Sequence, residues 1–388
     1  MVQRSINPSK SNSFFIFGAR GTGKSTFAKE QFRAGSLWTV DLLQPEQEDL
    51  YSREPMALSR SLRAMKARPE WILLDEIQKV PKLLNVVHLL IEEEKQKFIL
   101  TGSSARKLKR GAANLLAGRA FVYSLFPFTG HELGNSFSEE FYFRWGGLHR
   151  IYSLDSDDDR KNYLRSYGLT YLKEEIKEEQ LVRRLDPFRD FLEIAAQMSN
   201  RIVNYNKIGA DIGVEHKTVH SYFDILVDTW IGFYLPSFHQ SVRKSQLKSP
   251  KFYFFDIGVR KSLSRNTGNF SGPGTASFGE DFEQFIITEI FRWNEYAQND
   301  FRLSFLQTKN DNEIDLILSR GRQHIACEIK SSDRLDVQDV KRVETLAGDI
   351  KNCTAVYYIS RDHKRQMLGK VNCLHWQDFI VEFRHNRC

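Results

Sequence analysis

The feature that most constrains this chain is the stretch GARGTGKS, which directly follows the apolar run SFFIF. It fits the spacing G-x-x-x-x-G-K-[ST], with Gly18, Gly23, Lys24 and Ser25 at the defining positions. Glycines let the backbone curl so that its N–H groups converge on phosphate oxygens, and the helix expected next points its positive end at the same anion. The pattern therefore predicts a site for a nucleoside triphosphate between a strand and a helix.

The residue types in this loop predict a role for each position. Lys24 supplies a positive charge for the β and γ phosphates, and the hydroxyl of Ser25 is a Mg²⁺ ligand. The residues expected to hold the nucleotide are Gly18, Gly21, Thr22, Gly23, Lys24, Ser25, Thr26 and Asp75. The expected cofactors are ATP and Mg²⁺.

A second acidic element follows in PEWILLDEIQKVP, where four apolar residues are succeeded by Asp75 and Glu76. Asp75 is expected to hold Mg²⁺ through water, and Glu76 is expected to polarise the attacking water. Two carboxylates after an apolar strand would, taken alone, favour a helix N-cap. The glycine-rich loop upstream makes the catalytic interpretation the stronger one.

Two further polar positions complete the predicted catalytic set. The strand KFILTGSS ends in hydroxyl residues, of which Ser103 is the first choice and Ser104 the second for a contact with the γ-phosphate or the water; a simple turn is the alternative. Arg119 follows a glycine, and we expect it to stabilise transition-state charge in a neighbouring subunit, with Arg106 as competitor and a surface ion pair as the alternative. The predicted catalytic residues are Lys24, Glu76, Ser103 and Arg119.

Residues 204–238 have the pattern of a helix-turn-helix, with Gly213 at the turn and an apolar face on the second helix. Two strands around a basic loop follow, as in a winged helix. The residues predicted to contact DNA are Lys217, Thr218 and His220 on the helix and Arg243, Lys244, Lys248 and Lys251 in the loop. The net charge of +7 permits a polyanionic partner. Docking of a protein partner is the alternative.

The stretch NEIDLILSRGRQHIACEIKSS predicts a hairpin that carries a second acidic site. Glu328 and Lys330 are two residues apart and point to one face of a strand, and Asp315 on the adjacent strand can reach that face. Two carboxylates can hold Mg²⁺ against a phosphate, and the lysine can orient or deprotonate water. Chance occurrence of E-x-K in a strand is the alternative.

The motif order GARGTGKS, LLDEIQ, LTGSS, LLAGR, PFTGHEL and RWGGLHR resembles that of a large prokaryotic family of AAA+ ATPases over nearly the whole chain. The resemblance implies an α/β fold with a P-loop AAA+ core at 1–134, a helical lid at 135–195, a winged helix-turn-helix at 196–262 and a restriction-endonuclease-like domain at 263–388. It also implies nucleotide between subunits of a homo-oligomer, with a ring as one arrangement, and association with DNA.

Three residues take their expected roles from this resemblance. Arg150 in GGLHR falls at the position of a second-sensor arginine. The D…E-x-K arrangement resembles the PD-(D/E)xK nuclease core, in which Glu283 matches the first acidic position. Ile314 stands where that core has its proline. Many copies of this fold serve only to bind DNA or to hold a complex together, so cleavage is left open.

Composition narrows the setting. No apolar run approaches the length of a membrane span, and the polar N-terminus lacks the apolar centre of a secretory signal, so a cytoplasmic protein is expected. The four cysteines, Cys327, Cys353, Cys373 and Cys388, form no CxxC pair, which argues for reduced thiols and against a zinc site.

Three functional hypotheses remain. The leading one is an AAA+ ATPase that translocates or remodels DNA, branched DNA among the substrates, with a C-terminal module that cuts or grips it. The second is a nucleotide-dependent switch that docks a protein, with an inactive nuclease-like scaffold. The third is a nuclease that works without ATP and whose ATPase regulates access.

Overall fold

The computed structural model describes residues 2–32, 36–104, 116, 118–168, 185–239, 248–308 and 312–385. Arg106, Arg243, Lys244 and Cys388, which the sequence analysis named, lie outside these ranges. The chain divides into two compact units, which are described separately below. The first comprises Met1–Phe128, Leu148–Tyr152 and Ile225–Ile231, and the second comprises Thr129–Gly147, Ser153–Asp224 and Gly232–Cys388.

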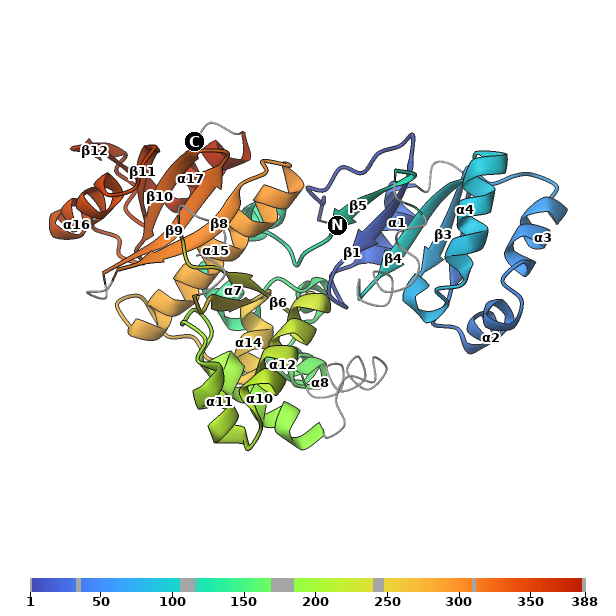
Figure 1. The fold of residues 1–388 in the computed structure, drawn as a ribbon, viewed down its shortest axis with the longest axis horizontal. Coiled ribbons are helices and arrows are strands. Elements are labelled where there is room, and N and C mark those ends of the chain that lie inside the picture. Colours follow the sequence, from blue (N-terminus) through green and yellow to red (C-terminus); the bar gives the residue numbers. More distant parts are fainter. Residues whose placement is uncertain are drawn as a thin grey trace. The chain divides into compact units, whose positions relative to one another are not determined.

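The first unit contains a five-stranded sheet, drawn in blue to teal in Figure 1. Its strands are β1 (Ser13–Phe17), β2 (Leu37–Asp41), β3 (Trp71–Asp75), β4 (Lys97–Gly102) and β5 (Ala120–Ser124). They lie in the order β2-β3-β4-β1-β5, and every neighbouring pair is parallel. The helices are α1 (Lys24–Gln31), α2 (Pro45–Arg53), α3 (Ala57–Ala64) and α4 (Leu83–Glu94), with short 3-10 turns at Ile77–Lys79 and His149–Ser153. The α/β fold expected for this part of the chain is therefore confirmed, and its sheet is parallel.

Both faces of this sheet are covered, which is why its strands read as continuous apolar runs. On one face Phe15 and Phe17 join a core cluster with Leu58 of α3 and Leu84 of α4. On the other face the ring of Phe14 lies 5.4 Å from that of Phe32, just after α1. Polar residues can therefore occur at the ends of these strands, where the covering helices no longer shield the sheet from water.

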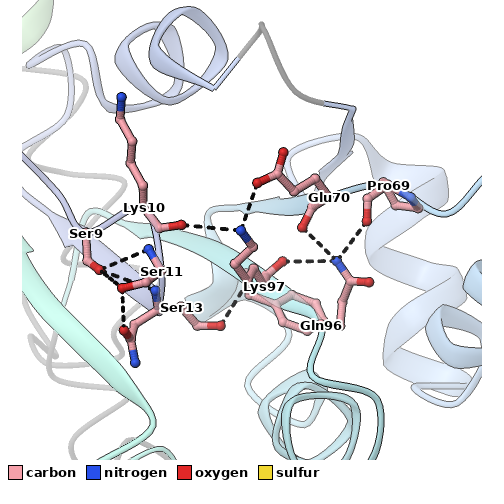
Figure 2. Close-up of polar contacts among 10 residues, drawn as sticks. Ser9, Lys10, Ser11, Ser13, Pro69, Glu70, Gln96 and Lys97 are labelled. Atoms are coloured by element: carbon pink, nitrogen blue, oxygen red, sulfur yellow. Dashed lines mark hydrogen bonds and ion pairs between the residues drawn. The ribbon is translucent and has the colours of Figure 1, made fainter.

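The amino ends of three strands are joined by polar contacts, which Figure 2 shows. Lys97, at the start of β4, donates to the carbonyl of Lys10 at 3.3 Å and to the carboxylate of Glu70 at 2.8 Å. The buried side chain of Gln96 donates to the carbonyls of Pro69 and Glu70, each at 3.2 Å. These bonds fix the end of the sheet opposite to the end that carries the glycine-rich loop.

The second unit begins with helical elements. They are α6 (Gly130–Leu133), a 3-10 turn (Gly134–Ser136), α7 (Glu139–Trp145), α8 (Asp157–Ser166), α10 (Leu185–Gln197), α11 (Tyr205–Ile212), α12 (His216–Asp228) and α14 (Ile257–Leu263). Between α12 and α14 lie the antiparallel strands β6 (Gly232–Leu235) and β7 (Lys251–Phe254). The two helices around Gly213 and the two strands after them occur where the sequence places them.

The rest of the second unit is a mixed sheet with three helices. Its elements are α15 (Ala276–Tyr296), β8 (Arg302–Gln307), β9 (Glu313–Arg320), β10 (Gln323–Ile329), α16 (Val337–Gly348), β11 (Cys353–Ser360), β12 (Gln366–Leu368), β13 (Val371–His375) and α17 (Trp376–Arg384). The order is β12-β13-β11-β10-β9-β8. β8, β9 and β10 form an antiparallel meander, and β11 runs parallel to β10 after the α16 crossover.

Two absences hold for the described part of the chain. None of its helices has both the length and the apolar composition needed to cross a membrane. Its three cysteines, Cys327, Cys353 and Cys373, are free thiols.

Candidate nucleotide site and acidic cluster

The glycine-rich loop adopts a conformation that its glycines permit. Gly21 and Gly23 have φ values of 77° and 89°, in the left-handed region that side chains disfavour. A Cβ on Gly18 would lie 2.1 Å from the carbonyl oxygen of Leu125, so only glycine fits there. Gly23 is the N-cap of α1, and the backbone therefore passes directly from the loop into the helix.

Lys24 is held inside this loop. Its side chain is buried, and its ammonium donates to the carbonyl oxygens of Gly18 at 2.8 Å and Ala19 at 3.2 Å. The hydroxyl of Thr22 also bonds to Ala19, at 2.8 Å, and is fully buried, whereas the side chain of Thr26 is exposed on the first turn of α1. The loop thus holds a cation against two of its own carbonyl groups.

Ser25 and Asp75 meet at the end of β3. The Ser25 hydroxyl donates to Asp75 Oδ1 at 2.7 Å, and the buried hydroxyl of Thr101 donates to the same oxygen. A hydroxyl and a carboxylate in contact beside a phosphate loop are the donor set that Mg²⁺ prefers. The residues predicted to hold the ion are therefore adjacent, and Thr101, which the sequence analysis passed over, orients the carboxylate.

Glu76 lies in a buried hydrogen-bond network with Gln78 and Ser103. Its Oε2 accepts from the hydroxyl of Ser103 at 3.0 Å, from the backbone N–H of Ser103 at 3.3 Å and from the amide of Gln78. Gln78 also donates to the Ser103 hydroxyl at 2.9 Å. The structure thus places Ser103 against Glu76, and Gln78 is a site residue that sequence reasoning missed.

This network sets the charge of Glu76. Burial by itself would raise the pKa of this carboxyl, but the charge of Lys24 and the hydrogen bonds from Gln78 and Ser103 outweigh it, so the pKa lies below its ordinary value. The residue also has a left-handed backbone (φ 59°), and its N–H donates to Thr101 at 3.1 Å. An ionised carboxylate is thereby kept in a fixed position at the edge of the sheet.

The N-terminal segment and the 3-10 turn at His149–Ser153 add two residues to the loop. Arg4 donates to the carbonyl of Thr22 at 3.2 Å, and its guanidinium lies 4.7 Å from the ring centre of Phe128. His149 approaches Gly23, because a Cβ there would lie 3.5 Å from its ring. Burial, with the charges of Arg4 and Arg150, lowers the pKa of His149. Arg150 itself, the predicted second-sensor arginine, is exposed.

Arg119 lies at the start of β5 and forms an exposed ion pair with Glu92 of α4. Its side chain is 38% exposed and that of Glu92 is 44% exposed. The surface ion pair, which the sequence analysis kept as the alternative, is present. Water screens an exposed pair of this kind, so the ion pair holds Arg119 only weakly.

The residues predicted to contact DNA differ in how far they are exposed to solvent. Lys217 and Lys248 are exposed, and Thr218 is half-buried. His220 is exposed and bonds through Nδ1 to Asp224 at 2.9 Å. The prediction that Lys251 contacts DNA is wrong. This residue begins β7, and its side chain is only 6% exposed. It is paired with carboxylates, so it is not a wing residue available to phosphates.

The C-terminal acidic residues form two adjoining groups. In the first, Glu328 Oε1 accepts from Lys330 and from Arg342 of α16, both at 2.7 Å, while Asp315 Oδ2 accepts from the backbone N–H of Ile329 at 2.7 Å. Burial and the charge of Asp315 raise the pKa of Glu328 to about 7, against the opposing charges of Lys330 and Arg342. Arg342 carried no signal in the sequence that linked it to this site.

The second group surrounds Lys251. Its ammonium lies 3.4 Å from Glu283 Oε1 of α15 and is paired with Glu313 of β9. The hydroxyl of Tyr253 donates to the same Glu283 oxygen at 2.6 Å. Sequence reasoning paired Glu283 with Asp315 and Glu328 but did not foresee that a lysine and a tyrosine from β7 would contact it.

Cations of the chain compete with a divalent metal ion for these carboxylates. Across the described ranges no three histidine, cysteine, aspartate or glutamate side chains come together as a metal site. Glu328 Oε1 already has two cationic partners, its buried Oε2 has no hydrogen-bond partner among the described residues, and a Glu283 oxygen is within reach of an ammonium. The predicted second Mg²⁺ site at Asp315 and Glu328 therefore gains no support.

Comparison with known families identifies the domain that contains the first of these sites. Residues 10–134 match a family model described as an AAA domain. Residues 136–269 and 278–379 match models that are each described as a domain of unknown function, DUF8612 and DUF4143. Residues 10–134 thus form an ATPase domain of the AAA type, and two further domains follow it.

Individual relatives are distant. The protein Mb2031c of Mycobacterium bovis and the protein Rv2008c of Mycobacterium tuberculosis are each 23% identical over 344 residues, which are 88% of this chain and 75% of theirs. A Walker-type ATPase of Pyrococcus abyssi is similar at 13% identity, over 64% of this chain and 90% of its own, with a TM-score of 0.41. Likeness at this level assigns no substrate.

Proposed function

We propose that this chain binds Mg²⁺–ATP at the glycine-rich loop and hydrolyses it, and that it uses this energy to act on DNA. The single observation that carries the proposal is the contact between the P-loop Ser25 and Asp75, with the buried Glu76 beside them. Ser25 lies on α1, Asp75 ends β3, and Glu76 follows it directly. Ser25 would supply a metal ligand, Asp75 would support it, and Glu76 would act as a base.

Ser25 and Asp75 would hold Mg²⁺, which when bound neutralises charge on the β and γ phosphates. Lys24 would leave its two carbonyl acceptors, Gly18 and Ala19, and turn to the phosphates. The loop N–H groups would bind and orient the triphosphate. Glu76, kept ionised, would accept the proton of the attacking water.

Gln78 and Ser103 position Glu76 and limit its reach. Both donate to Oε2, the same oxygen, which leaves Oε1 as the atom that can accept a proton from water. A shift of Gln78 would free the carboxylate, and a shift back would withdraw it. Gln78 and Ser103 therefore couple the position of Glu76 to residues 102–104, at the end of β4.

Contact with DNA is assigned to the exposed start of α12 and to Lys248. Lys217 and Lys248 are exposed cations, and cations of this kind bind backbone phosphates. We also propose a homo-oligomer in which Arg119 exchanges Glu92 for the nucleotide of a neighbouring subunit. Branched DNA remains part of this proposal.

The second candidate is a nucleotide-dependent switch that docks a protein partner. One observation favours it: Lys251, expected to meet phosphates, is buried among carboxylates. The set of cations predicted to contact DNA therefore loses Lys251. In this candidate the mixed sheet is a scaffold without catalysis.

Steady-state ATP turnover with and without duplex, single-stranded and branched DNA tests the proposal. We expect Mg²⁺-dependent turnover that DNA stimulates and that Lys24→Ala abolishes. Turnover that no DNA changes, together with capture of a protein partner only in the presence of ATP, would favour the second candidate. Absence of turnover in all conditions would overturn both.

A further inference from the structure

The acidic cluster of the mixed sheet contains a buried lysine that is paired with Glu283 and Glu313. Lys251 is the first residue of β7, pairs in register with Leu235 of β6, and forms a bridge with Ile202. Its backbone is thus fixed on both sides. Its side chain points inward with 6% exposure, and the position of its ammonium is set by the fold.

The ammonium is fully engaged. It lies 3.4 Å from a carboxylate oxygen of Glu283, pairs with Glu313, and sits 5.4 Å from the ring centre of Phe305 on β8. An ammonium has three donors, and two carboxylates and one aromatic face account for its surroundings. Burial would lower the pKa of Lys251, but the charges of Glu283, Glu313 and Asp315 outweigh burial and raise it, so the group stays charged.

A divalent cation would need the same oxygens. Mg²⁺ takes near-octahedral oxygen ligands at about 2.0–2.1 Å. Such an ion between Glu283 and Asp315 would have to share Glu283 with the ammonium and would be repelled by it. Lys330 and Arg342 each lie 2.7 Å from Glu328 Oε1, which leaves only the buried Oε2 of this carboxylate without a partner among the described residues. Cations of the chain itself therefore pair with Glu283 and with one oxygen of Glu328.

We propose that Lys251 replaces the divalent metal of a nuclease-like site, so that the mixed-sheet domain is a non-cleaving scaffold whose acidic cluster locks β7 to α15 and β9. The carboxylates that a nuclease would use for catalysis serve here as the acceptors of an internal ion pair. The inference goes beyond the proposed ATPase and does not require it. Removal of the lysine then uncovers a latent site for a divalent cation.

The test counts Mn²⁺ bound to the full chain without nucleotide, by electron paramagnetic resonance of the free ion. Four proteins are compared: wild type, Asp315→Asn, Lys251→Met, and Lys251→Met combined with Asp315→Asn. Lys351→Met, on an exposed lysine of the same domain, is the matched control. Because nucleotide is absent, failure of the ATPase proposal would leave this count unaffected.

We expect wild type and Asp315→Asn to bind the same number of Mn²⁺ ions. Lys251→Met should bind one more, and the double variant should lose it again. In thermal unfolding, Mn²⁺ should raise the Tm of Lys251→Met and leave that of wild type and of Lys351→Met unchanged.

Two results would overturn the inference. One is a Mn²⁺ ion on wild type that Asp315→Asn removes, since the site would then hold metal beside the lysine. The other is a folded Lys251→Met variant without the additional ion. Should Lys251→Met fail to fold, the comparison of wild type with Asp315→Asn decides the question by itself.

Discussion

At the scale of single residues, the site depends on how Glu76 is kept charged although it is buried. Only 8% of this residue is exposed, and an unpaired buried carboxylate would take up a proton. Lys24, Gln78 and Ser103 prevent this, one through its charge and two through hydrogen bonds. The same bonds restrict which oxygen can meet water. Charge and position are therefore set by one network.

The variant Gln78→Ala tests this network through pH. The wild-type pKa of Glu76 is lowered, so activity is expected to be retained down to acidic pH and to fall as pH drops through that pKa. Loss of one hydrogen bond to the carboxylate should raise the pKa of Glu76, and the acid limb of kcat/KM should move to higher pH.

The matched control for this variant is Gln377→Ala, an exposed glutamine on α17. It should leave the profile unchanged. An acid limb of Gln78→Ala that coincides with that of wild type, or lies at lower pH, would remove Gln78 from the positioning of Glu76.

At the scale of elements, the pair of helices α11 and α12 depends on a close approach between α11 and the turn that follows it. Gly209 lies in α11, and a Cβ there would meet the carbonyl oxygen of Val214 at 2.6 Å. Gly213 then turns the chain with φ 70°. On α12, Phe223 packs edge-on against Phe191 of α10, with ring centres 4.8 Å apart. The orientation of α12 thus depends on the absence of a side chain at Gly209 as well as on the packing of Phe223.

Gly209→Ala should therefore destabilise the second unit by about 1–3 kcal/mol, as overpacking does. Thermal unfolding followed by circular dichroism measures this. Gly348→Ala, in the last turn of α16, is the control, because a Cβ there meets nothing within 4 Å. Equal melting temperatures for the two variants would contradict the proposed contact.

Much of the fold was predictable from the sequence because its signals are local. Apolar runs ending in GARGTGKS and in Asp75–Glu76 identify strands and the site that follows them. Lys251 was not predictable in this way, since its partners Glu283 and Glu313 are 32 and more residues away and lie on other elements. From the sequence, a lysine in a basic stretch is predicted to lie on the surface. Only the tertiary contacts show that this one is buried.

Gln78 and Arg342 illustrate the same limit at the two sites. Gln78 follows the predicted acids by two residues, yet nothing local shows that its amide turns back to Glu76. Arg342 reaches Glu328 from α16, 14 residues further along the chain. Sequence patterns identify the acids of a site, whereas the residues that orient or neutralise them depend on packing.

At the scale of the whole molecule, we propose that ATP hydrolysis at the AAA domain is used to act on DNA. The net charge of +7 fits such a partner but is spread over the chain. Salt dependence separates a specific phosphate contact from this general charge, because each neutralised phosphate releases counterions.

The double variant Lys217→Ala/Lys248→Ala should weaken binding to duplex DNA and reduce the slope of log K against log salt by about two. Fluorescence anisotropy between low and moderate salt measures the slope. Lys351→Ala, an exposed lysine of the mixed-sheet domain, should leave it unchanged. A slope that is the same in all three proteins would move the DNA contact away from α12 and from Lys248.

The central claim is that Glu76 readies water for attack on ATP held at Lys24 and Ser25. Single-turnover hydrolysis of Mg²⁺–ATP by wild type and Glu76→Gln, with affinity measured by calorimetry on the same samples, tests it most directly. The account predicts similar affinity for both proteins and hydrolysis slower by about 10²–10⁴-fold in the variant. Hydrolysis at the wild-type rate by Glu76→Gln would contradict it.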